Sequence, residues 1–306
     1  MRKFIISDIH GSGNVYYSIM GYLDNISKNE DICLFINGDL IDRGIESGEI
    51  LFDIKERIRE NKYKIIYLGG NHELLMYQTY LDRENGINTY FNDWYDNGGS
   101  VTDDYILEKC NYETDKILDV VNFISNLDIY YKFNEKINDK NIVLVHAGCP
   151  IDVKDNCDLK IKTNNDDVFW YVWARENDPF IPFRCRIGNK DYYTIVGHTP
   201  NNSKYGFFYS KRDEYLNIDG GCAYYVSGYF KYNHTPLVEV NDGYFKILTF
   251  NNNNEVIYGN YFDGKRLFHI SNNELDRDRE YLNKEVKIKK LVKLPDNIIG
   301  YKDWIK

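Results

Sequence analysis

The stretch YKIIYLGGNHE, residues 63–73, joins a short apolar run directly to a polar cluster. The apolar run has the length and composition of a buried strand, and the glycine pair after it predicts a tight turn. Asn71 is a suitable residue to begin the helix that we expect next. A turn and a helix start do not require His72 and Glu73 as well. These two side chains therefore indicate chemistry at the end of the strand, provided that other parts of the chain supply partners.

Three apolar runs in the first third of the chain each precede a polar loop and a helical stretch. We expect strands at residues 3–7, 31–37 and 63–69, and helices at 14–28, 46–61 and from 71 onward. Runs of this length that alternate with helices predict βαβ units and a parallel or mixed sheet.

The remaining chain predicts more strands and a different arrangement. We expect strands at 141–148 and 192–200, a short helix at 166–177, and antiparallel strands from about residue 205. Residues 74–140 are longer than a crossover needs and contain helical pieces, so they predict a helical insertion or cap. We therefore expect a catalytic domain over residues 1–250 and a C-terminal extension, residues 251–306, packed on it or appended to it.

The composition favours a soluble globular protein that does not bind nucleic acid. Apolar residues make up 43% of the chain and charged residues 28%, and the formal net charge is −9. An acidic balance opposes nonspecific binding to nucleic acid and to anionic membranes. No apolar run is long enough to span a bilayer, and the N-terminus does not have the pattern of a signal peptide. We expect a cytoplasmic protein.

The six cysteines lie far apart and form no CxxC pair. In a chain of this size, that spacing favours small core residues over disulfide partners or thiolate metal ligands. Cys149 directly follows a histidine motif and is a candidate for redox sensitivity.

Polar side chains suited to metal binding follow each of the central strands. In chain order they are Asp8 and His10, then Asp39, Asp42 and Arg43, then Asn71 and His72, then His146, and finally His198. Four of the six histidines of the protein are in this set. In an open α/β sheet, such loops meet in one crevice beyond the carboxyl ends of the strands. Each motif alone is weak evidence, but five of them in one order predict a single metal-dependent site.

The order DIHG…GDLIDRG…GNHE…HAG…GHT resembles the calcineurin-like metallophosphoesterases. More narrowly, it is similar to the phosphoprotein-phosphatase (PPP) branch, including its small bacterial and phage serine/threonine phosphatases. The resemblance covers roughly residues 3–240. It implies an α/β fold, the four-layer α/β/β/α metallophosphoesterase sandwich, which here would carry a helical insertion and a C-terminal extension.

The resemblance also implies a dinuclear metal site. Asp8 and His10 would bind the first metal, Asp39 would bridge both, and Asn71, His146 and His198 would complete the second. A donor set of oxygen and nitrogen without thiolate suits Mn²⁺, which we expect, or Fe or Zn²⁺. Two ions about 3.5–4 Å apart would supply a bridging hydroxide for in-line attack on phosphorus.

The remaining residues of the motifs would act on the substrate. By resemblance, His72 is the general acid, Asp42 orients it, and Arg43 binds the substrate phosphate. Arg175, in the stretch VWAREN, resembles a second phosphate-binding arginine, with Arg184 and Arg186 as alternatives. Glu73 is assigned to structure, bonding loop amides or pairing with Arg43.

These features predict a metal-dependent phosphomonoesterase, and specifically a serine/threonine or dual-specificity protein phosphatase. Its partners would be a phosphorylated protein or a small phosphomonoester. Many metallophosphoesterases have a second ligand histidine in a GHxH motif, whereas here Thr199 and Pro200 follow His198, as in the PPP branch. The related symmetrical dinucleotide tetraphosphatases usually carry Ala where Asp42 stands. Hydrolysis of dinucleotide or nucleotide polyphosphates is therefore the alternative activity, and a non-catalytic scaffold on the same fold is the third.

Overall fold

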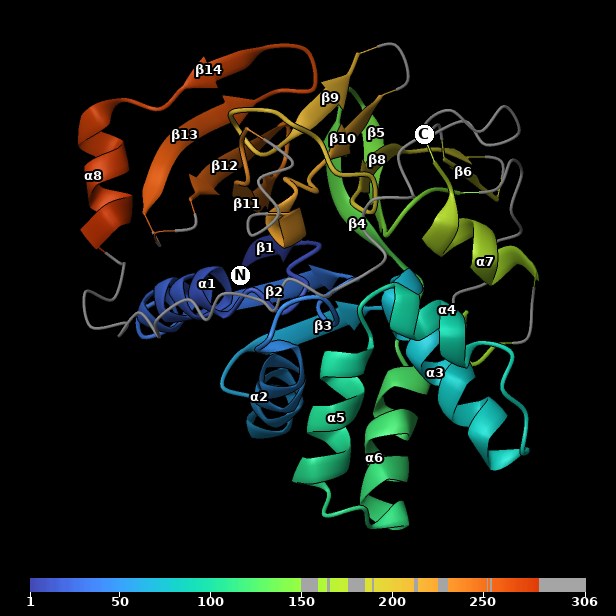
Figure 1. Ribbon diagram of the computed structural model, residues 1–306. Coiled ribbons are helices and arrows are strands. Elements are labelled where there is room, and N and C mark those ends of the chain that lie inside the picture. Colours follow the sequence, from blue (N-terminus) through green and yellow to red (C-terminus); the bar gives the residue numbers. More distant parts are fainter. Residues whose placement is uncertain are drawn as a thin grey trace.

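The computed structural model describes residues 1–149, 159–163, 166–175, 185–188, 190–211, 214–224, 231–251, 253 and 255–280. In these residues, helices enclose two packed sheets (Figure 1). The helices are α1 (Gly13–Ile26), α2 (Ser47–Glu60), α3 (Asn71–Glu84), α4 (Phe91–Asp96), α5 (Ser100–Lys109), α6 (Thr114–Ser125), α7 (Asp166–Trp173) and α8 (Asn272–Glu280), with a 3-10 turn η1 at Cys222–Tyr224. The strands are β1 (Arg2–Ile6), β2 (Ile32–Asn37), β3 (Lys64–Leu68), β4 (Tyr130–Ile137), β5 (Lys140–Val145), β6 (Arg186–Ile187), β7 (Lys190–Asp191), β8 (Tyr193–Val196), β9 (Phe208–Ser210), β10 (Tyr215–Asn217), β11 (Thr235–Asn241), β12 (Tyr244–Phe250), β13 (Val256–Phe262) and β14 (Leu267–His269).

Two mixed sheets form the centre of the protein. The first has seven strands in the order β14-β13-β12-β11-β1-β2-β3, and the second has five in the order β4-β5-β8-β10-β9. In the first sheet β1, β2 and β3 are parallel, and in the second β5, β8 and β10 are parallel. A separate two-stranded sheet consists of β6 and β7. The predicted βαβ units of the first third are confirmed, and their strands and helices begin and end within two residues of the expected positions.

The alternation of side chains along the central strands explains why both faces of each sheet are buried. Phe4 and Ile6 of β1 belong to the apolar cluster that contains α1 and α2, whereas Ile5 belongs to the cluster between the two sheets. In β5, Leu144 belongs to the cluster between the sheets, and Val143 belongs to the same cluster as Phe4 and Ile6. Successive side chains of a strand point to opposite faces, so a continuous apolar run requires cover on both sides.

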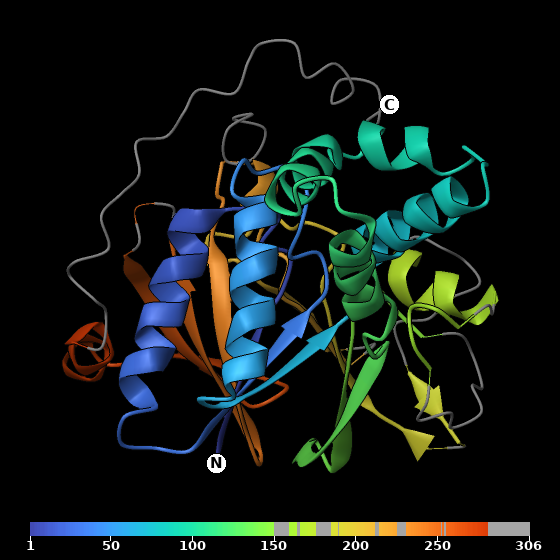
Figure 2. The same cartoon turned by 90° about the horizontal axis from the view of Figure 1, so that it is seen from below.

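Helices supply that cover, which completes the α/β/β/α sandwich. Figure 2 shows α1 and α2 side by side across the strands of the first sheet. On the second sheet, α7 contributes Tyr171, whose ring stacks on Tyr130 at 5.8 Å between centroids. The backbone N–H of Ala147, just beyond β5, donates to the Tyr171 carbonyl. The predicted sandwich is confirmed.

The segment expected to be a helical insertion is helical over most of its length but ends in a strand. Helices α3, α4, α5 and α6 follow one another, α5 packs on α2, and α3 packs on α4 and α6. Strand β4 was not expected and forms the edge of the second sheet. The sequence YYKFNEKI of β4 interrupts its apolar residues with lysine, asparagine and glutamate, so it lacks the continuous apolar run that marked the central strands.

The described part of the segment expected to be a C-terminal extension continues the first sheet, because β13 and β14 are its last two strands. Strand β13 pairs antiparallel with β12, β14 pairs with β13, and Leu275 of α8 lies in the core. None of the helices in the described residues is both long and apolar enough to cross a membrane.

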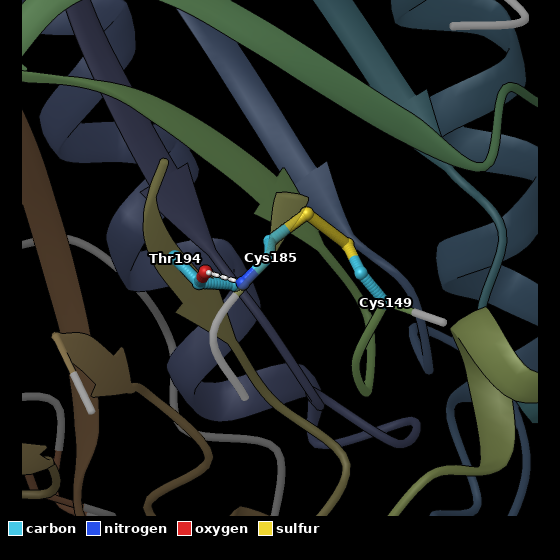
Figure 3. Close-up of a disulfide and its surroundings, with 3 residues drawn as sticks. All are labelled: Cys149, Cys185 and Thr194. Atoms are coloured by element: carbon cyan, nitrogen blue, oxygen red, sulfur yellow. Dashed lines mark hydrogen bonds between the residues drawn. A yellow bond between two sulfur atoms is a disulfide. The ribbon is translucent and has the colours of Figure 1, made fainter. Parts of the chain in front are cut away.

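The prediction for the cysteines is wrong at one pair. Cys149, just beyond β5, and Cys185, just before β6, form a disulfide with their Cα atoms 5.2 Å apart (Figure 3). The two residues are 36 positions apart, so no local sequence pattern predicts the disulfide, and the fold alone brings them together. Cys33, Cys110 and Cys222 are buried and unbridged, as predicted. Cys157 lies outside the described residues.

Candidate active site

The loops that carry the predicted site residues have unusual backbone conformations. Six of these residues have left-handed φ values between 46° and 73°: Asp8, His10, Asp39, Asp42, Arg43 and His198. Such a conformation costs a residue other than glycine roughly 1–3 kcal/mol, and these conformations concentrate at functional sites. The chain turns sharply after each strand, and the turns bring polar side chains together beyond the strand ends.

One cluster joins the exits of β2, β3, β5 and β8. His146 Nε2 lies 3.3 Å from Asp39 Oδ1 and 3.1 Å from Asn71 Oδ1, and His198 Nδ1 lies 2.8 Å from the same Asn71 oxygen. His146 Nδ1 lies 2.8 Å from the carbonyl oxygen of Asn37, which leaves Nε2 directed at the cluster. All four side chains of the cluster are buried. Ligand atoms of Asp39, His146 and His198 lie close enough together to hold one metal ion.

A second cluster shares Asp39 and lies on the side of β1 and β2. His10 Nε2 is 3.4 Å from Asp39 Oδ2, and His72 Nε2 is 3.9 Å from the same oxygen. The Arg43 guanidinium lies against both imidazoles, with Nη1 2.9 Å from His10 Nε2 and Nη2 3.0 Å from His72 Nε2. Because a guanidinium can only donate, both Nε2 atoms accept, and each ring carries its proton on Nδ1. The Nδ1 atom of His10 then donates to the Ile41 carbonyl at 3.0 Å.

His72 and Asp42 form a fully buried pair. His72 Nδ1 donates to Asp42 Oδ2 at 2.7 Å, and neither side chain has exposed surface. A carboxylate on Nδ1 holds an imidazole in one orientation and leaves Nε2 directed into the site. The structure therefore brings together the two residues for which the sequence predicted an acid and its orienting partner.

Glu73 organises the loop after β2 rather than reaching the reacting centre. Its carboxylate accepts the backbone N–H groups of Asp39, Leu40 and Gly70 at 2.8–3.1 Å, and the Tyr67 hydroxyl at 2.6 Å. Gly70 is the residue before α3, so Asn71 begins the helix without capping it through its side chain. The assignment of Glu73 to loop amides is confirmed.

Asp8 lies beside these clusters and is held by two donors. Its Oδ1 accepts the backbone N–H of His198 at 2.9 Å, and its Oδ2 accepts the Ser7 hydroxyl at 2.5 Å. Asp219, just beyond β10, was not predicted as part of the site. It is buried near Asp8 and Asp39, and its Oδ1 accepts the N–H of Gly221 at 2.9 Å. The signal that could have found it is the same one used elsewhere, a polar residue in a Gly-rich loop after a strand.

The charges of the site perturb each other strongly. Burial lowers the pKa of His146, but Asp39 and Asp8 outweigh this effect and raise it to about 10. Burial would raise the pKa of Asp39, yet the surrounding histidines hold it well below its usual value. Burial and the Arg43 cation lower the pKa of His10. Burial and the His146 cation do the same for His198. His10 and His198 are therefore neutral at pH 7, the form in which an imidazole binds a metal.

The arginines differ in how far the structure connects them to the site. Arg43 contacts both histidines directly. Arg175 is exposed two residues beyond α7, and its charge helps to lower the pKa of His198. Arg186 belongs to β6 and lies 3.9 Å from Asp191. Arg184 lies outside the described residues.

The residues present fit a pair of metal ions. His198 Nε2 is buried without a hydrogen-bond partner, although burying an unpaired polar atom is costly. Asp39 belongs to both groups of side chains that could hold an ion, one with His10 and His72, the other with His146 and His198. The donor atoms are carboxylate, amide and imidazole, without thiolate, which suits Mn²⁺, Fe or Zn²⁺.

The family of the chain follows from its sequence as well as from this site. A model of the calcineurin-like phosphoesterase family matches residues 1–228, more than half of the chain. The protein therefore belongs to the calcineurin-like phosphoesterases. Membership indicates a hydrolase that acts on phosphoesters and a site for two metal ions. No curated protein matches the chain.

Several solved structures are similar to this fold at low sequence identity. A protein serine/threonine phosphatase from Saccharomyces cerevisiae, described as similar to human PP5, is 14% identical, with a TM-score of 0.49 over 79% of this chain and 73% of that one. A cold-active protein-tyrosine phosphatase of a psychrophilic Shewanella is also 14% identical, with a TM-score of 0.46 over 83% and 78%. A metallophosphoesterase from Sphaerobacter thermophilus is 14% identical, with a TM-score of 0.36 over 78% and 82%.

Proposed function

We propose that this protein is a metal-dependent phosphomonoesterase, and specifically a protein phosphatase acting on phosphoserine and phosphothreonine, with phosphotyrosine as a further substrate to be tested. The observation that carries the proposal is the buried His72–Asp42 pair next to Arg43. A proton donor and a phosphate-binding fork side by side suit a small monoester, whose leaving oxygen needs protonation.

Arg43 binds the phosphoryl group of the substrate. Its guanidinium has two donors directed at acceptors in the site, and a planar fork matches two oxygens of a phosphate. Arg175 is the proposed second donor, and its exposed position allows it to reach a substrate that approaches from solvent.

His72 delivers a proton to the leaving oxygen. Asp42 fixes the ring through Nδ1, so Nε2 is the atom that would give up the proton. Because Nε2 accepts from Arg43 in this structure, the substrate phosphate would first take over the Arg43 donors, and the ring would take up a proton on Nε2 before passing it to the leaving oxygen. General acid catalysis supplies roughly 10²–10⁴ in rate. Hydrolysis of phosphate monoesters requires far larger accelerations, toward about 10²¹ at the extreme. His72 therefore has to act together with metal ions.

Six side chains would hold the two ions. Asp8, His10 and Asp39 are proposed for the first, and Asp39, Asn71, His146 and His198 for the second. When bound, such ions activate water and neutralise phosphoryl oxygens. The shared position of Asp39 and the unpartnered Nε2 of His198 support this assignment.

The metal assignment is tested by anomalous scattering from crystals soaked in Mn²⁺. We expect two peaks about 3.5–4 Å apart on either side of Asp39. A single ion that does not contact Asp39 would contradict the dinuclear site. His72 as a direct ligand is a separate outcome of the same experiment, and it would contradict the role of His72 as acid.

The alternative activity is hydrolysis of a dinucleotide tetraphosphate or another nucleotide polyphosphate. The two activities are separated by assaying the Mn²⁺-loaded protein on a phosphopeptide, an aryl monophosphate and a dinucleotide tetraphosphate under the same conditions. We expect the first two to be turned over well and the third more slowly. A preference of tenfold or more for the dinucleotide would move the protein to the alternative class. A protein that binds metal and hydrolyses none of the three would be a scaffold.

The proposal includes a cytoplasmic location and no nucleic-acid partner. The net charge of −9 supports the absence of a nucleic-acid partner. The Cys149–Cys185 disulfide weighs against a cytoplasmic location, because disulfides rarely persist in a reducing cytosol. The location is tested by alkylating free thiols in intact cells before purification. Alkylated Cys149 and Cys185 would support a cytoplasmic location, and an intact disulfide would contradict it.

A further inference from the structure

The helical insertion makes contact with the carboxylate that orients His72. Trp94 of α4 donates its indole Nε1–H to Asp42 Oδ2 at 2.8 Å, and Thr102 of α5 donates its hydroxyl to Asp42 Oδ1 at 2.5 Å. Both residues are completely buried. Asp42 Oδ2 is the same oxygen that accepts His72 Nδ1–H. Both carboxylate oxygens therefore have fixed partners, and two of those partners belong to the insertion.

The insertion also contacts the backbone of the Asp42 loop. The N–H of Asp42 lies 2.6 Å from Ser47 Oγ, which lies 2.6 Å from Thr102 Oγ1. Ser47 can thus donate to Thr102, and Thr102 to the Asp42 carboxylate, in one chain of hydrogen bonds. The N–H of Arg43 donates to the carbonyl of Gly98 at 3.0 Å.

The glycines of the NGGS stretch, residues 97–100, make this close approach possible. Gly98 has φ +90°, a conformation that other residues rarely adopt, and it lies against the backbone of Arg43. A Cβ atom on Gly99 would lie 2.4 Å from the indole ring of Trp94. Larger residues here would push the insertion away from the loop.

We propose that Trp94 and Thr102 are positioning residues for general acid catalysis, so that the helical insertion is part of the catalytic apparatus and not only a cap. This inference rests on the proposed phosphomonoesterase activity. Two charge-assisted donors hold the Asp42 carboxylate in one plane, and that carboxylate in turn aims the His72 ring. Outer partners of this kind typically contribute 10- to 100-fold in activity.

The inference predicts a loss that depends on the leaving group. T102V removes one donor from Asp42 with little change in volume, and W94F removes the other. We expect each variant to lower kcat/KM by about 10- to 100-fold for phenyl phosphate, whose leaving oxygen needs a proton. For p-nitrophenyl phosphate, which leaves without help, we expect a loss of no more than a few-fold. Inhibition by inorganic phosphate should remain unchanged, because Arg43 is intact.

Y95F is the matched control. Tyr95 is the neighbour of Trp94 on α4, and its hydroxyl donates to Asp103 Oδ2 at 2.5 Å. The substitution therefore also removes one donor from a buried carboxylate of α5, but among the described residues the hydrogen-bond partners of the Asp103 carboxylate are Tyr80, Arg83 and Tyr95 and do not include His72. We expect Y95F to affect both substrates equally and slightly. T102V decides the question if W94F does not fold.

A readout that does not depend on activity is a double-mutant cycle of unfolding between Asp42→Asn and Thr102→Val. We expect the two changes to be non-additive, because the residues share a hydrogen bond. If the wild-type protein is active but T102V and W94F lower kcat/KM equally for both substrates, as Y95F does, the positioning role is overturned and the proposed function stands. If the wild-type protein hydrolyses neither phosphate, the proposed function is overturned. If, in addition, the unfolding free energies of Asp42→Asn and Thr102→Val add, the interaction between Asp42 and Thr102 is overturned as well.

Discussion

The two sides of the site differ in how completely the protein itself satisfies their polar atoms. On the side of α3 and the insertion, His72, Asp42 and Arg43 have donors and acceptors at hydrogen-bond distance. On the side of β5 and β8, the Nε2 of His198 is buried without a partner. The first side is organised by the fold alone, whereas the second is suited to completion by metal ions. The difference implies that substitutions on the two sides will have distinguishable effects.

Asp39 joins the two sides, so its loss is expected to have the largest effect. Asp39→Asn should abolish binding of both ions and lower activity by at least about 10³-fold, more than the 10- to 100-fold typical of an outer partner. Metal content by elemental analysis together with kcat/KM measures both. Two retained ions in the variant would show that Asp39 is not a bridge.

His72 tests the organised side without disturbing the other. His72→Asn should retain both ions and lower turnover of substrates with poor leaving groups by roughly 10²–10⁴-fold. An activated aryl phosphate should lose much less, since it does not need the proton. Loss of metal in this variant, or an equal loss on both substrates, would assign His72 to the ligands instead.

The arginines test which contacts bind phosphate. Because a charged hydrogen bond contributes roughly 1.5–3 kcal/mol, Arg43→Ala and Arg175→Ala should each lower kcat/KM by about 10- to 100-fold and weaken inhibition by phosphate in parallel. Arg186→Ala is the control, since Arg186 lies near Asp191. An effect of Arg186 equal to that of Arg175 would leave Arg175 without a special role.

The dependence of metal affinity on pH tests the metal side through its charges. With a pKa of about 10, His146 carries a proton at neutral pH in the metal-free protein, and a metal ion has to displace it. The apparent affinity for Mn²⁺ should therefore rise by about tenfold per pH unit between pH 6 and pH 8, a slope set by one released proton.

Titration calorimetry in two buffers of different ionisation enthalpy counts the released protons. A pH-independent affinity would contradict the raised pKa of His146. The same raised pKa stabilises the metal-free protein fully below the ordinary histidine value of about 6.5, and this contribution to the free energy of unfolding is lost as the pH rises toward 10.

The sequence predicted the central strands and the loops of the site because both depend on local signals. Continuous apolar runs mark strands that are buried on both faces, and polar residues after each run mark the strand ends. Strands β4 and β13 lack such runs, and their positions in the sheets are decided by the strands with which they pair, β5 and β12.

The sequence alone determined the family, the order of the strands and helices in the first third, and the kinds of side chain at each strand end, because these depend on neighbouring residues. Only the tertiary structure brought Trp94 and Thr102 to Asp42, Asp219 to Asp8, and Cys149 to Cys185. Each of these contacts joins residues at least 36 positions apart, and none has a local pattern. Packing the insertion on the two sheets places these side chains together, and a buried polar group such as the Asp42 carboxylate is stable only where donors such as Trp94 and Thr102 meet it.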